Sequence, residues 1–111
     1  MAVLAKGVFG MTTRSATLLV VHLLGESHAS EIAAITGKSL SRIQGALESL
    51  ELAGLVVGSQ EGRTRRVRLN PRFPALAELQ VFLTKLGTLD VDLQQRLAIK
   101  RRRPRRVGKA I

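Results

Sequence analysis

The apolar residues in the N-terminal third of the chain recur with the period of an α-helix. They stand three or four positions apart, at Ala16, Leu19, Val20, Leu23 and Leu24, which places them on one side of a helix. Thr12 or Thr13 is a suitable N-cap, and Gly25 is a suitable stop. The pattern predicts one amphipathic helix between these signals, preceded by a short helix or an arm that contains Val8.

Two further helices are predicted, separated by only a few residues. The first covers 29–36 and ends at Gly37, and Glu31 is placed to close a free N–H group at its start. Ser39 is a good N-cap for the second, which ends at Gly54. The inward positions of the second helix are Ile43, Ala46, Leu47, Leu50 and Ala53.

The period then changes from that of a helix to that of a strand. Residues 55–57 are rich in β-formers, and residues 65–69 alternate between charged and apolar side chains. With a turn over 59–62 and a stop at Asn70-Pro71, this predicts a two-stranded hairpin. Helices are predicted over 73–86, with apolar residues on more than one face, and over 89–103, before Pro104.

The order helix, short helix, tight turn, helix and hairpin predicts a mainly α fold with a small β-hairpin, a winged helix-turn-helix. The stretches "VFGMTTRSATLLVVHLL", "SEIAAITGKSLSRIQGALESLELAGLV" and "EGRTRRVRLNP" resemble successive blocks of the ArsR-like winged-helix transcriptional regulators. The resemblance covers roughly residues 7–83, and "ALESLELAGLV" with the hairpin after it is its most specific part. It implies a dimeric repressor or activator that binds palindromic operator DNA.

Charge points to a polyanionic partner and is unevenly distributed. The 111 residues include 18 Lys or Arg against 8 Asp or Glu, for a net charge of +10 and a pI near 11.7. Residues 100–111 hold seven of the basic residues and no acidic one. We therefore predict one domain over 1–99, which binds DNA and dimerises, and a basic disordered tail over 100–111.

Several function classes are disfavoured by composition. Aromatic residues make up only 3%, too few for a platform that stacks single-stranded bases, and the absence of cysteine excludes thiolate chemistry. Asp90 and Asp92 do not share a helix face and have no histidine near them, so we expect no metal site and assign Asp90 to N-capping. His22 is expected at the edge of the core. No phosphate loop or catalytic set is present, so we expect neither an enzyme nor a cofactor.

Membrane association is not expected either. The longest uncharged stretch, 15–25, is too short to span a bilayer. Cleavage of this stretch as a secretory signal would remove a helix that the rest of the pattern needs. We therefore expect a cytoplasmic protein.

The start of the third helix is the expected DNA-reading element, because helix-turn-helix proteins place it in the major groove. Arg42 is suited to guanine and Gln44 to adenine. Gly45 either lets the backbone approach DNA closely or leaves the readout poor. The alternative is an ordinary solvated helix face. The candidate residues are Ser39, Leu40, Ser41, Arg42, Gln44 and Gly45.

The hairpin supplies the second set of candidates, for contact with the minor groove or with phosphates. Alternation puts Arg66 and Arg68 on one face and Arg65 and Val67 on the other. A charged edge strand that prevents aggregation is the alternative. The hairpin candidates are Arg63, Thr64, Arg65 and Arg66. Weaker candidates for phosphate contacts are Arg14, Ser30, Lys38, Arg101, Arg102 and Arg103.

The apolar surplus of the predicted helix over 73–86 suggests a second copy of the chain as its partner, with packing inside one chain as the alternative. The predicted dimer residues are Val8, Phe9, Leu79, Phe82, Leu83 and Leu86. Together these expectations favour a homodimeric regulator of transcription that binds specific double-stranded DNA. The alternatives are a winged helix that binds another protein, and a nonspecific or architectural nucleic-acid-binding protein that depends on its tail.

Overall fold

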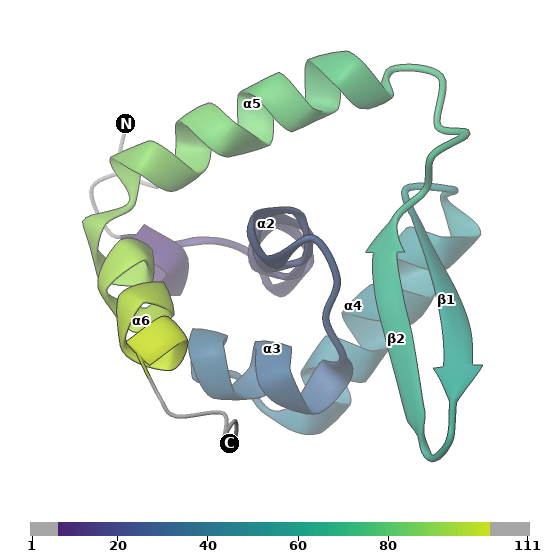
Figure 1. Ribbon diagram of the computed structural model, residues 1–111, viewed down its shortest axis with the longest axis horizontal. Helices are drawn as coiled ribbons and strands as arrows, with labels where there is room; N and C mark the ends of the chain where they lie inside the picture. The colour runs from purple at the N-terminus through teal and green to yellow at the C-terminus, as the bar shows by residue number, and fades with distance from the viewer. Residues whose placement is uncertain (1–6, 103–111) are drawn as a thin grey trace, which may run out of the picture.

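Five α-helices and one β-hairpin follow a short 3-10 turn in the computed structural model (Figure 1), which describes residues 7–102 apart from the side chains of 7, 9, 101 and 102. The elements are η1 (Gly7–Gly10), α2 (Thr13–Leu24), α3 (Ala29–Thr36), α4 (Leu40–Leu52), β1 (Val56–Glu61), β2 (Thr64–Leu69), α5 (Leu76–Leu89) and α6 (Val91–Arg102). The predicted mainly helical class with a small hairpin is confirmed. In the described part, no helix is long and apolar enough to cross a membrane.

Helix α2 lies in the middle of the molecule, with α3, α4, α5 and the hairpin around it (Figure 1). Leu19, Val20 and Val21 are consecutive and fully buried, so more than one side of this helix is covered. The predicted single stripe was therefore too narrow. Thr12 caps the helix by accepting a hydrogen bond from the Ser15 amide at 3.1 Å, as expected.

A short connection over 37–39 brings α3 to α4, and local caps fix where α4 begins. The Ser39 hydroxyl accepts a hydrogen bond from the Arg42 amide at 3.3 Å, which confirms the predicted N-cap. The inward face of α4 is buried as predicted, except that Ala53 follows the end of the helix and is exposed.

The strands of the hairpin extend further toward its tip than the sequence predicted. Glu61 pairs with Thr64, so the turn consists of Gly62 and Arg63 rather than residues 59–62. Gly62 has a φ of 64°, the left-handed region that such two-residue turns require. On its other side β2 is joined by Ser27, whose amide and carbonyl both bond to Val67, at 3.0 and 2.8 Å. The hairpin is therefore fastened to the segment that precedes α3.

Helix α5 approaches α2 closely because one residue has no side chain. A Cβ built on the buried Gly87 would lie 2.9 Å from the methyl carbons of Leu23. This packing corrects part of the predicted dimer interface: Val8 and Leu83 are buried in the core of the single chain, at 0% and 3% exposure. Leu79 and Leu86 are half-buried against that core. Phe82 is 60% exposed, and the side chain of Phe9 lies outside the described residues.

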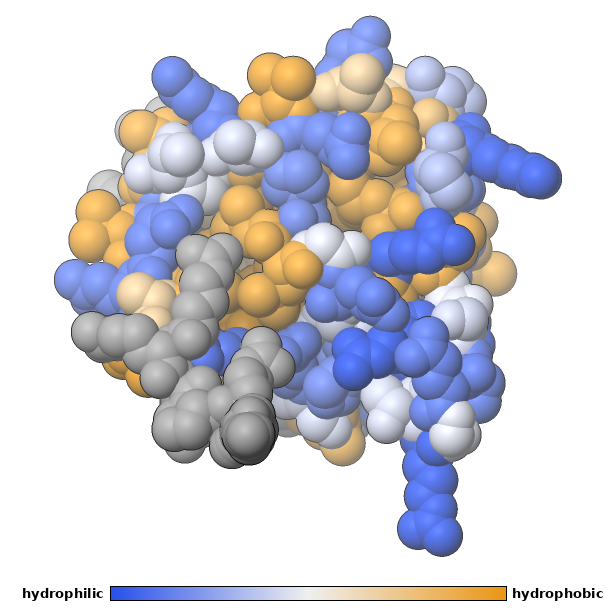
Figure 2. Space-filling view, viewed as in Figure 1, coloured by the Kyte–Doolittle hydropathy of each residue, from blue (hydrophilic) through white to orange (hydrophobic). Residues whose placement is uncertain are grey.

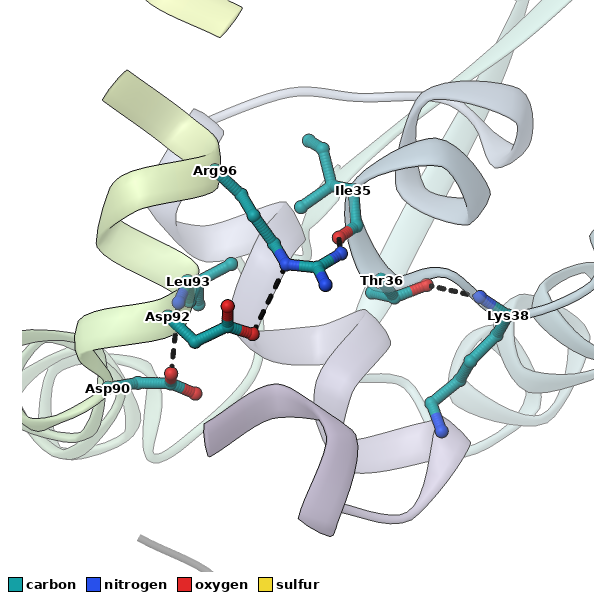
Figure 3. A network of polar contacts seen from close by, with 7 residues as sticks. All are labelled: Ile35, Thr36, Lys38, Asp90, Asp92, Leu93 and Arg96. Carbon is teal, nitrogen blue, oxygen red and sulfur yellow. Dashed lines mark hydrogen bonds and ion pairs between the residues drawn. The ribbon is translucent and has the colours of Figure 1, made fainter. Parts of the chain in front are cut away.

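Helix α6 is capped at its start by a local contact and is joined to the end of α3 by Arg96 (Figure 3). Asp90 accepts a hydrogen bond from the Leu93 amide at 3.0 Å, which confirms that it caps α6. Arg96 forms an ion pair with Asp92 at 3.1 Å and donates to the Ile35 carbonyl, at the end of α3, at 2.6 Å. The last turn of α3 is thereby held by the C-terminal part of the fold.

The carboxylate of Glu31 joins the segment before α3 to the C-terminal part of α6. It accepts from the Ser27 hydroxyl at 2.6 Å and pairs with Lys100 at 2.7 Å, so it does not close the start of α3 as predicted. Burial alone would raise the pKa of Glu31, but the bonds from Lys100 and Ser27 outweigh it and hold that pKa below its ordinary value. Lys100 is thus helical and paired, and the predicted tail boundary at residue 100 falls inside α6.

The contact between His22 and Thr84 predicts a dependence of stability on pH. His22 Nε2 lies 2.7 Å from Thr84 Oγ1, and burial lowers the pKa of His22 below 6.5. A lowered pKa means that the folded state binds fewer protons between that pKa and 6.5, so the free energy of unfolding falls as pH drops through this window. Urea unfolding at about pH 7.5 and pH 5 should therefore show a smaller decrease for His22→Gln than for the unsubstituted chain. An equal decrease in both proteins would contradict the assignment.

Candidate nucleic-acid interface

The exposed face of α4 carries most of the predicted DNA-reading residues. Burial of Ile43, Leu47 and Leu50 fixes the rotation of the helix about its axis. The residues left in solvent are Leu40, Ser41, Arg42, Gln44, Gly45, Glu48 and Leu52. Ser41, Arg42 and Gln44 follow the 44% exposed Leu40 at the N-terminal end of this face, whereas Glu48 and the 87% exposed Leu52 occupy its C-terminal end.

A shallow depression of about 270 Å³ joins the N-terminal half of α4 to the hairpin and the start of α3. Gln44 and Leu40 line it from α4, Thr64 from β2, Arg63 from the turn and Ser30 from α3. These candidates come from three separate segments of the chain and meet on one surface. The remaining lining residues are His28, Ala29, Gln60 and Arg65.

Arg42 does not belong to this depression. It lies two residues before Gln44, which on an α-helix is about 200° around the axis. Arg42 therefore projects from the other flank of α4, on the side away from the hairpin. Arg42 and Gln44 were predicted to read bases together, but α4 presents them in different directions.

Arg65 is tied to α4 by an ion pair. Its Nη2 lies 2.6 Å from Glu51 Oε1, and its Nε donates to Oε2 at 3.4 Å. The hydrogen bond and charge of Glu51 raise the pKa of Arg65. The guanidinium crosses β1 above Gly58, where an added Cβ would come within 2.8 Å of it. Arg65, predicted to contact DNA, is thus already engaged in joining the hairpin to α4.

Arg66 is directed to the opposite face of the hairpin. It lies 3.5 Å from Glu61 and 3.8 Å from Glu26, and it does not line the depression beside α4. The predicted alternation along β2 is therefore present, and it removes Arg66 from the surface that holds Gln44 and Arg63.

The weaker phosphate candidates are dispersed. Ser30 lines the depression, whereas Arg14 is exposed on the first turn of α2 and is not among the lining residues. Lys38 stands in the connection before α4, and its amide donates to the Thr36 hydroxyl at 3.3 Å (Figure 3). The side chains of Arg101 and Arg102, and the whole of Arg103, lie outside the described residues.

Three lining residues, His28, Ala29 and Gln60, were not among the predicted candidates. His28 stands directly before α3, and its Nδ1 is buried without a hydrogen-bond partner among the described residues. The only sequence signal for His28 was its place at the start of the predicted helix-turn-helix segment. No group of three or more His, Cys, Asp or Glu in that part of the chain could hold a metal ion.

Comparison with known proteins does not assign the chain to a family. No protein-family model matches the sequence, and no curated protein matches it significantly. The resemblance to ArsR-like regulators therefore stays a prediction.

The close approach of the Arg65 guanidinium to Gly58 can be used to test how the hairpin is held against α4. Gly58→Ala should displace the Arg65 guanidinium and loosen the hairpin while changing the free energy of unfolding little, because exposed ion pairs stabilise weakly. Faster amide hydrogen exchange over residues 58–65 would report the loosening. Glu51→Gln should give the same exchange pattern. Gly45→Ala is the control, since its Cβ meets nothing within 4 Å; unchanged exchange in both test variants would contradict this role of Arg65.

Proposed function

We propose that the chain is a transcriptional regulator that binds specific double-stranded DNA through a winged helix-turn-helix, with α3 and α4 as the helix pair and the hairpin as the wing. The observation that carries the proposal is the shared depression of Gln44, Ser30, Arg63 and Thr64. A helix in the major groove and a wing on the adjacent backbone must reach one duplex together. The convergence of these side chains meets that requirement.

Within this proposal the residues take different roles. Ser41 and Gln44 lie on the exposed N-terminal half of α4 and would face base edges. Arg63 at the tip of the hairpin and Arg42 on the far flank have no carboxylate partner within the described residues, so they are available for phosphates or a groove on either side of the helix. Arg65 positions the wing.

A second candidate function is supported by the C-terminal half of the same face. A groove of about 700 Å³ runs between α4 and β2; Glu48, Glu51 and Leu52 line it from the C-terminal half of α4, and Ser41, Gln44 and Gly45 line it from the N-terminal half. Carboxylates repel phosphates, and an exposed leucine is a contact typical of protein interfaces. Binding of another protein through this groove is therefore the alternative to DNA binding.

Base reading by α4 is tested by comparing specific and nonspecific duplexes. A preferred sequence is first selected from a random duplex pool with the full chain. Gln44→Ala should then weaken binding to that sequence by about 1–3 kcal/mol and change binding to a scrambled duplex much less. Fluorescence anisotropy across a salt series measures both affinities.

Deletion of residues 103–111 is the matched control for charge, because it removes four basic residues and leaves α6 intact. It should weaken both duplexes by similar factors and reduce the salt slope by about 0.9 for each phosphate that the shortened chain no longer neutralises. Equal weakening on both duplexes for Gln44→Ala would contradict base reading. Failure to select any sequence, with no affinity after the deletion, would favour the protein-binding alternative.

We further propose that the regulator is a homodimer that pairs through the outer side of α5, where Val81 is 71% and Phe82 60% exposed. No helix or strand covers this side of α5 in Figure 1. Glu78 and Lys85 flank Phe82 on the same side, and neither has an ion pair in the described part of the chain. In an antiparallel pair centred between Val81 and Phe82, Glu78 of each copy lies opposite Lys85 of the other. The surface is self-complementary in both charge and apolar contact.

Substitutions on α5 test this pairing by light scattering at micromolar concentration. Phe82→Glu should raise the dissociation constant of the dimer about 10–100-fold, as expected for a central aromatic contact. Lys85→Glu should weaken the dimer by placing like charges opposite each other, and adding Glu78→Lys should restore it. A monomeric unsubstituted chain, or no restoration by the double variant, would contradict the proposed register.

A further inference from the structure

The hairpin has a second face, which the proposed DNA contact does not use. Arg65 and Val67 face α4, so Arg66 and Arg68, which alternate with them along β2, face the other way. Arg66 pairs with Ser59 and Arg68 with Val57 across the two strands. The two guanidinium groups therefore extend from neighbouring positions on one side of the hairpin.

A depression of about 400 Å³ lies on this outer face. Arg66 and Arg68 line it from β2, and Arg72 lines it from the loop that follows. Glu26 borders it on the α3 side, and the half-buried Val57 is its apolar part. Figure 2 shows long hydrophilic side chains projecting from the hairpin side of the molecule.

The borders of the depression are held by bonds to the backbone. Asn70 accepts from the Arg72 amide at 2.9 Å and donates to the Gly54 carbonyl at 2.9 Å, which fixes the loop that carries Arg72. The pairing of Ser27 with Val67 holds Glu26 beside β2. The three arginines are thus brought together by the fold and not by chance rotamers alone.

The charges around the depression are unbalanced. Arg66 has long ion pairs with Glu26 at 3.8 Å and Glu61 at 3.5 Å. Arg68 and Arg72 are exposed, and neither has a carboxylate within 4 Å among the described residues. Arg66 is offset by the carboxylates of Glu26 and Glu61, which leaves the two positive charges of Arg68 and Arg72 without a carboxylate partner in the described part of the chain. A dianion would relieve the repulsion between these groups.

We propose that this depression binds a small organic phosphate. Guanidinium groups match the oxygens of a phosphate in bidentate geometry, and a phosphate monoester carries close to the two negative charges that are lacking. The volume lies at the lower end of the range for small-molecule sites, and Val57 offers an apolar contact to the organic part. This site is separate from the proposed DNA contact, because Arg68 and Arg72 line neither the depression nor the groove beside α4 and Arg68 follows Arg63 by five residues, about 17 Å along an extended strand.

The proposal is tested by an NMR titration of the full chain with inorganic pyrophosphate, against sodium chloride at matched ionic strength. Saturable amide shifts are expected at Gly58, Ser59 and Asn70. Arg68→Ala/Arg72→Ala should weaken the binding at least about tenfold, since it removes two charge-assisted contacts. All four substituted arginines in this test and its control are exposed, so folding should be retained.

Arg42→Ala/Arg63→Ala is the control, because it removes the same charge elsewhere and should leave pyrophosphate binding unchanged. Equal weakening by both double variants, or shifts that do not saturate, would overturn the proposal in favour of nonspecific attraction. A third outcome would also overturn it: a reduction of duplex affinity in Arg68→Ala/Arg72→Ala as large as in the control, which would assign the outer face to DNA. The pyrophosphate results do not depend on the proposed function, whereas the duplex comparison requires that the control itself lose duplex affinity.

Discussion

The complete burial of α2 is the constraint on which the rest of the structure depends. Ala16, Leu19, Val20 and Val21 are all fully buried, so this helix must be covered from several directions. Helices α3 and α4 cover it on one side and α5 on another, and the hairpin closes the remainder (Figure 1). Burial of each such large aliphatic side chain contributes about 1.5–3 kcal/mol. The orientation of α4 toward solvent is therefore a consequence of how α2 is packed.

The hairpin is too small to be stable alone, and its attachments determine what its side chains can do. Backbone hydrogen bonds between Ser27 and Val67 join one edge of β2 to the segment before α3. The Arg65–Glu51 pair joins the inner face of the hairpin to α4. These bonds fix the tip of the hairpin beside the N-terminal half of α4. The same alternation that directs Arg65 inward directs Arg66 and Arg68 outward, so one strand serves two surfaces.

Local sequence signals predicted the elements well, and long-range partners account for what they missed. The caps at Thr12, Ser39 and Asp90 were visible because each needs only a side chain and a backbone amide three residues away. The engagement of Arg65 by Glu51 was not visible, because fourteen residues and a turn separate them. Likewise the burial of Val8 and Leu83 depends on the positions of α5 and α6, which no periodicity specifies. The sequence thus identified a basic surface and could not say which of its cations were already paired.

That distinction changes the physical basis of the proposed DNA contact. Arg65, Arg66 and Lys100 are paired with carboxylates, and Arg96 with Asp92, so these four cations of the described part are offset locally. Two arginines line the depression beside α4. Arg65 is paired with Glu51, whereas Arg63 has no ion pair among the described residues. Phosphate attraction grows with the number of free cations, whereas base discrimination depends on the side chains that reach base edges. Under the proposed function, Ser41 and Gln44 would supply discrimination, and phosphate attraction would be shared between Arg42 and Arg63 of the folded domain and the basic residues after α6.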